Sequence, residues 1–166
     1  MADSLRSSKR RRTSHSETQN DAVETTNTKN LSPLVVFAHG AGAPSTSDWM
    51  IRCCEKAVAK HPDHPLILAG KSMGSRVSCM VASRDDISAS AIVCLGYPLK
   101  GMNGAIRDEI LVQLTIPIMF VQGSKDGLCP LDKLKAVRKK IKPNNDLHVI
   151  EGGDHSFKLL KAFASK

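Results

Sequence analysis

Residues 66–74 read L-I-L-A-G-K-S-M-G, and this stretch decides the fold that we expect. Four apolar residues in a row are typical of a strand buried in a parallel sheet. The pattern G-x-S-x-G follows at once, with Ser72 between Gly70 and Gly74, and an apolar helical pattern comes after it. Strand, tight turn and helix predict a nucleophile elbow, in which small glycines avoid steric collisions and the serine projects at the carboxyl end of the sheet.

Two other interpretations of this stretch were weighed. The letters G-K-S also end a phosphate-binding loop, which needs a further glycine five positions before Gly70. Pro65 stands at that position, so the phosphate loop is excluded. A chance match to G-x-S-x-G is the second alternative, and the remainder of the chain decides against it.

Composition limits the class of protein. The 166 residues suit one domain, and their low aromatic content of 4% predicts an aliphatic core. The net charge is +8, but no aromatic residues alternate with the basic ones, so we expect no specific nucleic-acid partner. Five cysteines without a C-x-x-C pair favour free thiols in a reducing compartment. No apolar run reaches the length of a membrane span, so we expect a soluble, intracellular protein without a membrane partner.

The N-terminal residues 1–30 form a basic tail that we expect to be disordered, because it is polar and offers almost no aliphatic residues to a core. It contains the basic cluster Lys9, Arg10, Arg11 and Arg12. This cluster could be a nuclear-import signal or an ordinary solvated charge run, so both cytoplasm and nucleus are expected locations.

Residues 31–166 are expected to form the folded domain. Apolar runs separated by helical patterns predict a three-layer α/β sandwich with a mostly parallel sheet of about five strands. The expected strands are 34–38, 66–69, 89–95, 116–121 and 146–150, and the expected helices are 49–60, one directly after Ser72, 105–111, 131–141 and a closing helix within 157–166.

Three reactive side chains each follow the end of a different strand. They are Ser72, Asp126 and His155, and parallel strands bring such positions to one edge of the sheet. A histidine can take the proton of a serine hydroxyl, and a carboxylate can orient that histidine, so we predict a Ser-His-Asp catalytic triad. Asp132 and Asp154 were alternatives to Asp126, but Asp132 suits the first turn of a helix and Asp154 is too near His155 in sequence.

A second loop accompanies these residues. Residues 39–42 read H-G-A-G and follow the first expected strand. Gly40 and Gly42 would let the backbone approach the nucleophile closely. We therefore expect an oxyanion hole made by the N–H groups of Ala41 and Met73.

A zinc site was the other chemistry considered. His61 and His64 lie near Cys53 and Cys54, but intervening prolines and the wrong ligand spacing favour a turn. We expect no metal and no other cofactor.

The motifs together resemble a known family. The runs H-G-A-G, G-K-S-M-G, G-S-K-D-G and G-G-D-H-S-F look like the dienelactone-hydrolase-like branch of the α/β-hydrolase superfamily. The run 70–75 and L-G-Y-P-L at 95–99 resemble, more narrowly, the family of testis-expressed protein 30, to which the third subunit of the NSL histone-acetyltransferase complex is related. The resemblance implies a hydrolase-like domain and allows a nuclear, chromatin-associated role. The ordered triad with both oxyanion loops predicts a serine hydrolase of ester or thioester type that acts on an unidentified small-molecule ester or acyl substrate. The alternative is a catalytically silent interaction module of a nuclear chromatin-regulating complex.

The chain departs from that family in one place. Only one helix fits between Gly42 and Leu66, so we expect a strand and a helix of the family to be missing between residues 52 and 65. A splice variant or an incomplete gene model would explain the loss. The strand at 34–38 then becomes an edge, and we expect Val35, Val36 and Phe37 to be exposed or only partly covered.

Overall fold

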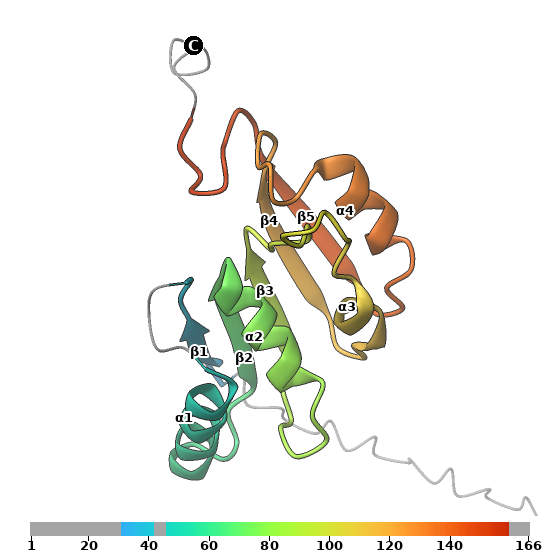
Figure 1. Ribbon diagram of the computed structural model, residues 1–166. Coiled ribbons are helices and arrows are strands. Elements are labelled where there is room, and N and C mark those ends of the chain that lie inside the picture. The colour runs from blue at the N-terminus through green and yellow to red at the C-terminus, as the bar shows by residue number, and fades with distance from the viewer. Residues whose placement is uncertain (1–30, 42–45, 160–166) are drawn as a thin grey trace, which may run out of the picture.

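The computed structural model describes residues 31–41 and 46–159, which alternate between strands and helices along the chain (Figure 1). The elements are β1 (Leu34–Ala38), α1 (Ser47–Lys60), β2 (Leu66–Lys71), α2 (Met73–Ala82), β3 (Ala91–Leu95), α3 (Glu109–Gln113), β4 (Ile118–Gly123), α4 (Leu131–Arg138) and β5 (Asn145–Ile150). All five strands are parallel, in the order β1-β2-β3-β4-β5. The predicted fold class, a parallel α/β sheet of five strands, is confirmed.

Two expected helices need correction. The helix expected at 105–111 is instead Glu109–Gln113, because a turn closed by Gly101 N–H donating to Ala105 O (2.7 Å) occupies the earlier residues. The helix expected to reach residue 141 ends at Arg138. The expected tail 1–30, with its basic cluster, lies outside the described residues. Within 31–41 and 46–159, no helix is long and apolar enough to cross a bilayer.

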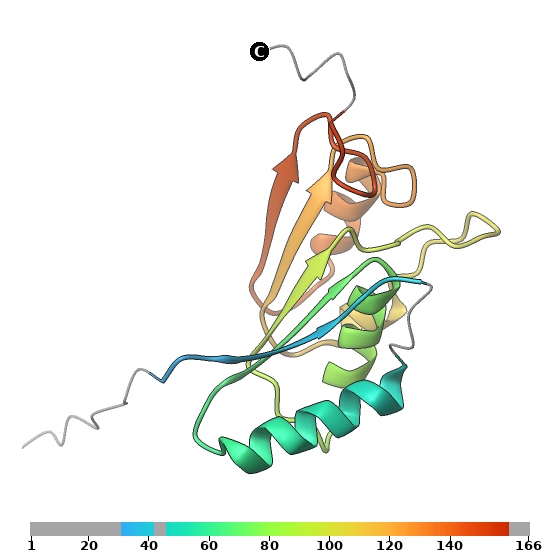
Figure 2. The same cartoon turned by 90° about the vertical axis from the view of Figure 1, so that its left-hand side faces the viewer.

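All four helices lie on one face of the sheet (Figure 2). One cluster of buried side chains joins α1 and α2 to Val36 and Leu68, and another joins α2, α3 and α4 to Ile92 and Phe120. The register places these four strand residues on the same face. Successive strands are added in one direction, and right-handed crossovers then put each connecting helix on the same side.

The opposite face of the sheet has no helix among the described residues, so the third layer of the expected sandwich is not present there. The closing helix expected in 157–166 lies outside the described residues from position 160 on. Val35 and Phe37 on this face are 59% and 43% exposed. Val36 was expected to be poorly covered but is only 8% exposed, because alternation along the strand turns it toward α1.

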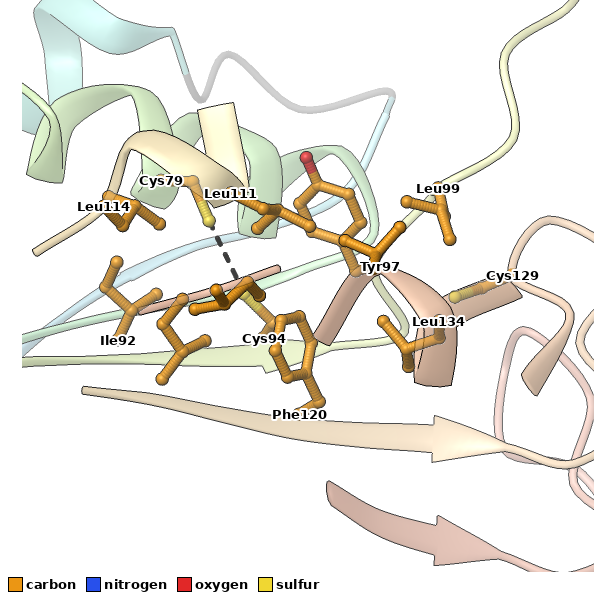
Figure 3. Close-up of a cluster of buried hydrophobic side chains, with 13 residues drawn as sticks. Cys79, Ile92, Cys94, Tyr97, Leu99, Leu111, Leu114, Phe120, Cys129 and Leu134 are labelled. Carbon is orange, nitrogen blue, oxygen red and sulfur yellow. Dashed lines mark hydrogen bonds between the residues drawn. The ribbon is translucent and has the colours of Figure 1, made fainter. Parts of the chain in front are cut away.

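The larger cluster lies under α2, α3 and α4 and is mainly aliphatic (Figure 3). Its aromatic members, Tyr97 and Phe120, meet edge to face with ring centroids 6.5 Å apart. Cys79 and Cys94 are free thiols whose sulfur atoms lie 3.7 Å apart. This packing anchors the carboxyl ends of β3 and β4, where the functional loops begin.

Two glycines set the distance between the sheet and α2. A Cβ atom on Gly74 would lie 2.0 Å from the backbone oxygen of Ala38, and one on Gly70 would lie 2.2 Å from the backbone carbon of Gly74. Both contacts are with backbone, which cannot rotate away as a side chain can. The expected steric role of Gly70 and Gly74 therefore has a specific cause, the close approach of β1, β2 and α2.

Because of this contact, we expect Gly74→Ala to lower the free energy of unfolding by about 3 kcal/mol or more, in the upper range for overpacked sites. Gly127→Ala is the matched control, since a Cβ there meets no atom within 4 Å. Its effect should stay within about 0.5 kcal/mol. Urea denaturation followed by circular dichroism measures both, and equal midpoints would contradict the packing argument.

The edge position of β1 predicts its local stability. Among the described strands it is bonded only to β2, and its Val35 and Phe37 side chains are exposed. We expect amide hydrogen exchange to be faster in Leu34–Ala38 than in Leu66–Lys71, because segments with few buried apolar contacts open first. Equal protection of the two strands, measured by mass spectrometry, would show that the edge is not weak.

Candidate active site

Ser72 lies at the turn between β2 and α2 in an unusual backbone conformation. Its φ of 54° and ψ of −120° are disfavoured for a residue with a Cβ atom. Hydrogen bonds hold this conformation: Ser72 N–H donates to Leu95 O (2.8 Å), and Ser75 donates to Ser72 O through its N–H (3.0 Å) and its hydroxyl (2.6 Å). A strained serine between Gly70 and Gly74 has the geometry of a nucleophile elbow.

The structure brings His155 into contact with Ser72. The Ser72 hydroxyl lies 2.7 Å from His155 Nε2, and His155 Nδ1 lies 2.8 Å from Asp126 Oδ2. An ionised carboxylate can only accept, so Nδ1–H donates to Asp126 and leaves Nε2 free to accept the serine proton. The Asp126 side chain is fully buried, whereas that of His155 is 27% exposed and reachable from solvent.

Asp126 is held by two further donors. Its Oδ1 accepts from Leu128 N–H (2.8 Å), and its Oδ2 also accepts from Gln122 Nε2 (2.5 Å). These bonds compensate for burying the carboxylate and fix its direction toward His155. Gln122 was not among the residues predicted to belong to the site. Its signal was a polar residue within the apolar run of β4, and its Oε1 has no hydrogen-bond partner within the described part of the chain.

Asp154, the alternative to Asp126, has a different task. Its Oδ1 accepts from the N–H groups of Ser156 (2.8 Å) and Lys158 (2.9 Å). Phe157, in the same turn, has a φ of 65° and donates its N–H to Asp154 O (3.0 Å). Asp154 therefore shapes the loop that presents His155.

The loop that carries Asp126 is bound directly to the loop that carries His155. Lys125 N–H donates to Gly153 O (2.9 Å), and Gly152 N–H donates to the Ser124 hydroxyl (2.8 Å). A Cβ on Gly123 would lie 2.3 Å from Gly153 O, so the two backbones pack tightly. The relative position of acid and histidine is thus supported by contacts between the two backbones and by the Ser124 hydroxyl.

Of the two loops expected to bind an oxyanion, Met73 and Gly40 lie beside Ser72. Met73 is the first residue of α2, where backbone N–H groups have no partner within the helix. Gly40 packs against the elbow, since a Cβ there would lie 3.4 Å from Ser72 Cβ. Ala41 follows as an exposed turn residue, and Gly42 lies outside the described residues.

A cysteine lies close to this site. Cys129 is fully buried, and its N–H donates to Asp126 O (3.2 Å). Burial, reinforced by the nearby Asp126 charge, raises the pKa of the Cys129 thiol to about 12. It therefore stays protonated and weakly nucleophilic at neutral pH, which leaves Ser72 as the candidate nucleophile.

His61 and His64, the histidines near Cys53 and Cys54, make contacts other than metal coordination. The rings of His61 and His64 meet edge to face at 5.4 Å, and His64 Nδ1 donates to Ser32 O (2.7 Å). Within the described ranges, no three His, Cys, Asp or Glu side chains are grouped to hold a metal ion.

Known structures share this fold. A cold-adapted esterase from an Arctic intertidal metagenomic library is 24% identical with a TM-score of 0.53 and covers 66% of this chain. Est1E from Butyrivibrio proteoclasticus is 18% identical with a TM-score of 0.57; the match covers 77% of this chain and 81% of Est1E. An alpha-beta serine hydrolase homologue from Coxiella burnetii is 24% identical with a TM-score of 0.50 and covers 63% of this chain.

These identities establish likeness of fold alone. The chain spans about half of the Arctic esterase and of the Coxiella protein, 48% of each. The family model described as an alpha/beta hydrolase domain matches residues 51–165. This match covers more than half of the chain, and the chain therefore belongs to the alpha/beta hydrolase domain family.

Proposed function

We propose that this chain is a serine hydrolase of ester or thioester type. The observation that carries the proposal is the continuous hydrogen-bonded series from the Ser72 hydroxyl through His155 to the buried Asp126. In this proposal Ser72 is the nucleophile, His155 the general base and Asp126 the group that orients His155. Family membership supports hydrolysis as the class of reaction.

The reaction would proceed in two halves. His155 Nε2 takes the proton of the Ser72 hydroxyl as the oxygen attacks the acyl carbon, and Asp126 stabilises the imidazolium that forms. The N–H groups of Met73 and Ala41 would donate to the tetrahedral oxyanion. The bond to the leaving group then breaks, and that group receives the proton from His155. A water molecule, deprotonated by His155, releases the acid from the acyl-enzyme and restores Ser72.

The ester class has additional support. One structural neighbour is named a cold-adapted esterase, and Est1E is known with ferulic acid bound. For this chain the acyl group and the alcohol or thiol remain to be identified. The narrower resemblance to the testis-expressed protein 30 family is likewise part of the proposal, resting on the sequence runs at 70–75 and 95–99.

We expect a fluorophosphonate probe to label the wild-type protein and to leave Ser72→Ala unlabelled, because the probe phosphonylates only an activated serine. Ser83→Ala is the matched control, since Ser83 is an exposed serine at the other end of α2. It should label at the wild-type rate. Labelling of Ser72→Ala equal to that of the wild type, with both variants folded by circular dichroism, would refute the proposal.

A second candidate is a catalytically silent interaction module of a nuclear complex. The observation that favours it is the sheet face without a helix among the described residues, on which Val35 and Phe37 are 59% and 43% exposed. Exposed apolar side chains of this kind commonly mark protein contacts. The basic cluster Lys9–Arg12 would supply nuclear import in this candidate.

Replacing Val35 and Phe37 together by serine tests the second candidate. Both side chains are exposed, so the change should cost little stability. Proteins retained from nuclear extract by the wild type and by Ser72→Ala should be lost from this double variant if the face binds a partner. Retention of the same proteins by all three would exclude a role of this face in binding.

A further inference from the structure

Lys71 is the residue directly before the candidate nucleophile, and its side chain crosses the end of β3 to reach another loop. It is the last residue of β2 and pairs with Leu95. Its ammonium group donates a hydrogen bond to the backbone oxygen of His155. The chain segment that carries the serine is thereby joined to the segment that carries the histidine.

Two other residues shape the path of this side chain. The Lys71 ammonium lies 4.1 Å from the centroid of the Phe157 ring, a cation–π distance. Gly96 stands under it with a φ of 60°, and a Cβ there would lie 2.7 Å from Lys71 Nζ. The Lys71 ammonium group thus occupies the space that the missing side chain of Gly96 leaves, next to the ring of Phe157.

The charge is partly withdrawn from water in this position. Burial lowers the pKa of Lys71 below its ordinary value, while Asp126 and Asp154 oppose that shift. A surface lysine normally keeps its ammonium hydrated. Here a backbone carbonyl and an aromatic face replace part of that hydration, so the side chain holds a defined position.

The two connections of the His155 loop differ in kind. A main-chain bond from Lys125 and a bond from the Gly152 N–H to the Ser124 hydroxyl tie it to the loop of Asp126. Among the described residues, its hydrogen bonds to the serine turn are made by side chains, those of Lys71 and of the Ser72–His155 pair. The acid–histidine distance thus has backbone support, whereas the connection to the serine turn is through side chains.

We propose that Lys71 is a positioning residue that holds the His155 loop against the nucleophile turn and so sets the distance from the Ser72 hydroxyl to His155 Nε2. This inference rests on the proposed function. Lys71 does not touch the reacting atoms, and its effect passes through the backbone of His155.

Lys71→Met keeps an unbranched side chain one atom shorter than that of lysine, and it removes the charge and the donor. We expect its maximal rate of fluorophosphonate labelling to fall about 10- to 100-fold with little change in probe affinity, because small displacements of catalytic groups have effects of this size. Lys71→Arg keeps charge and donors and should recover most of the rate. Lys135→Met is the control: Lys135 is an exposed lysine on α4, and the variant should match the wild type. Wild-type labelling by Lys71→Met would overturn the inference.

Hydrogen exchange decides the inference without catalysis. We expect faster exchange in Lys71→Met at the amides of Ser156, Phe157 and Lys158, with β4 unchanged. Unchanged exchange in that loop would refute the proposal that Lys71 holds the His155 loop in place. If the fluorophosphonate probe does not label the wild type, the proposed function fails. The role of Lys71 is then decided by hydrogen exchange in the His155 loop alone. If Lys71→Met unfolds and β4 loses its protection, hydrogen exchange is measured in Lys71→Gln instead. The Gln amide is polar but one bond shorter than the lysine ammonium, so we expect it not to reach the backbone oxygen of His155.

Discussion

The backbone contact between Gly74 and Ala38 is the constraint on which the rest of this structure depends. It brings the first turn of α2 against the end of β1, and Gly70 completes the contact from β2. At the turn between β2 and α2, Ser72 adopts a positive φ of 54°. The same contact places Gly40 beside the serine. The reactive hydroxyl and the loop expected to bind the oxyanion are therefore fixed by one steric requirement.

The order of the strands explains the second large feature, the sheet with helices on one side. Because each strand is added next to the previous one in the same direction, right-handed crossovers place α1 to α4 together. The opposite face keeps the apolar side chains of a buried sheet, such as Val35 and Phe37, without a helix over them in the described residues. The carboxyl ends of all five strands still meet at one edge, so the described residues assemble the candidate site without helices on the opposite face of the sheet.

The strands are predicted from the sequence because their signals are local, whereas the roles of Ser72, Asp126 and His155 stay predictions, although the structure brings the three side chains together. The apolar run at 66–69 and the motif around Ser72 predict a strand, a turn and a helix. The predicted ends of two later strands indicate Asp126 and His155 as candidate site residues. Which face Val36 uses could not be predicted, since it depends on the side that α1 occupies. Gln122 and Lys71 were missed because their roles depend on side-chain contacts: Gln122 bonds Asp126 across the turn after β4, and Lys71 bonds a loop 84 residues away.

The parts of the site differ in how firmly the fold holds them. Asp126 and His155 extend from β4 and β5, whose loops are joined by main-chain bonds, and β4 packs on the larger buried cluster. The loop with Ala41 extends from β1, the edge strand with two exposed apolar side chains. Loss of one oxyanion donor typically lowers kcat by about 10²–10³. Under the proposed function, loosening of β1 would therefore reduce turnover of unreactive esters while Ser72, His155 and Asp126 stayed in place, and a reactive phosphonate, which needs less stabilisation, would still be attacked. Labelling would then measure the serine, the histidine and the acid, whereas turnover would also measure the integrity of this edge of the sheet.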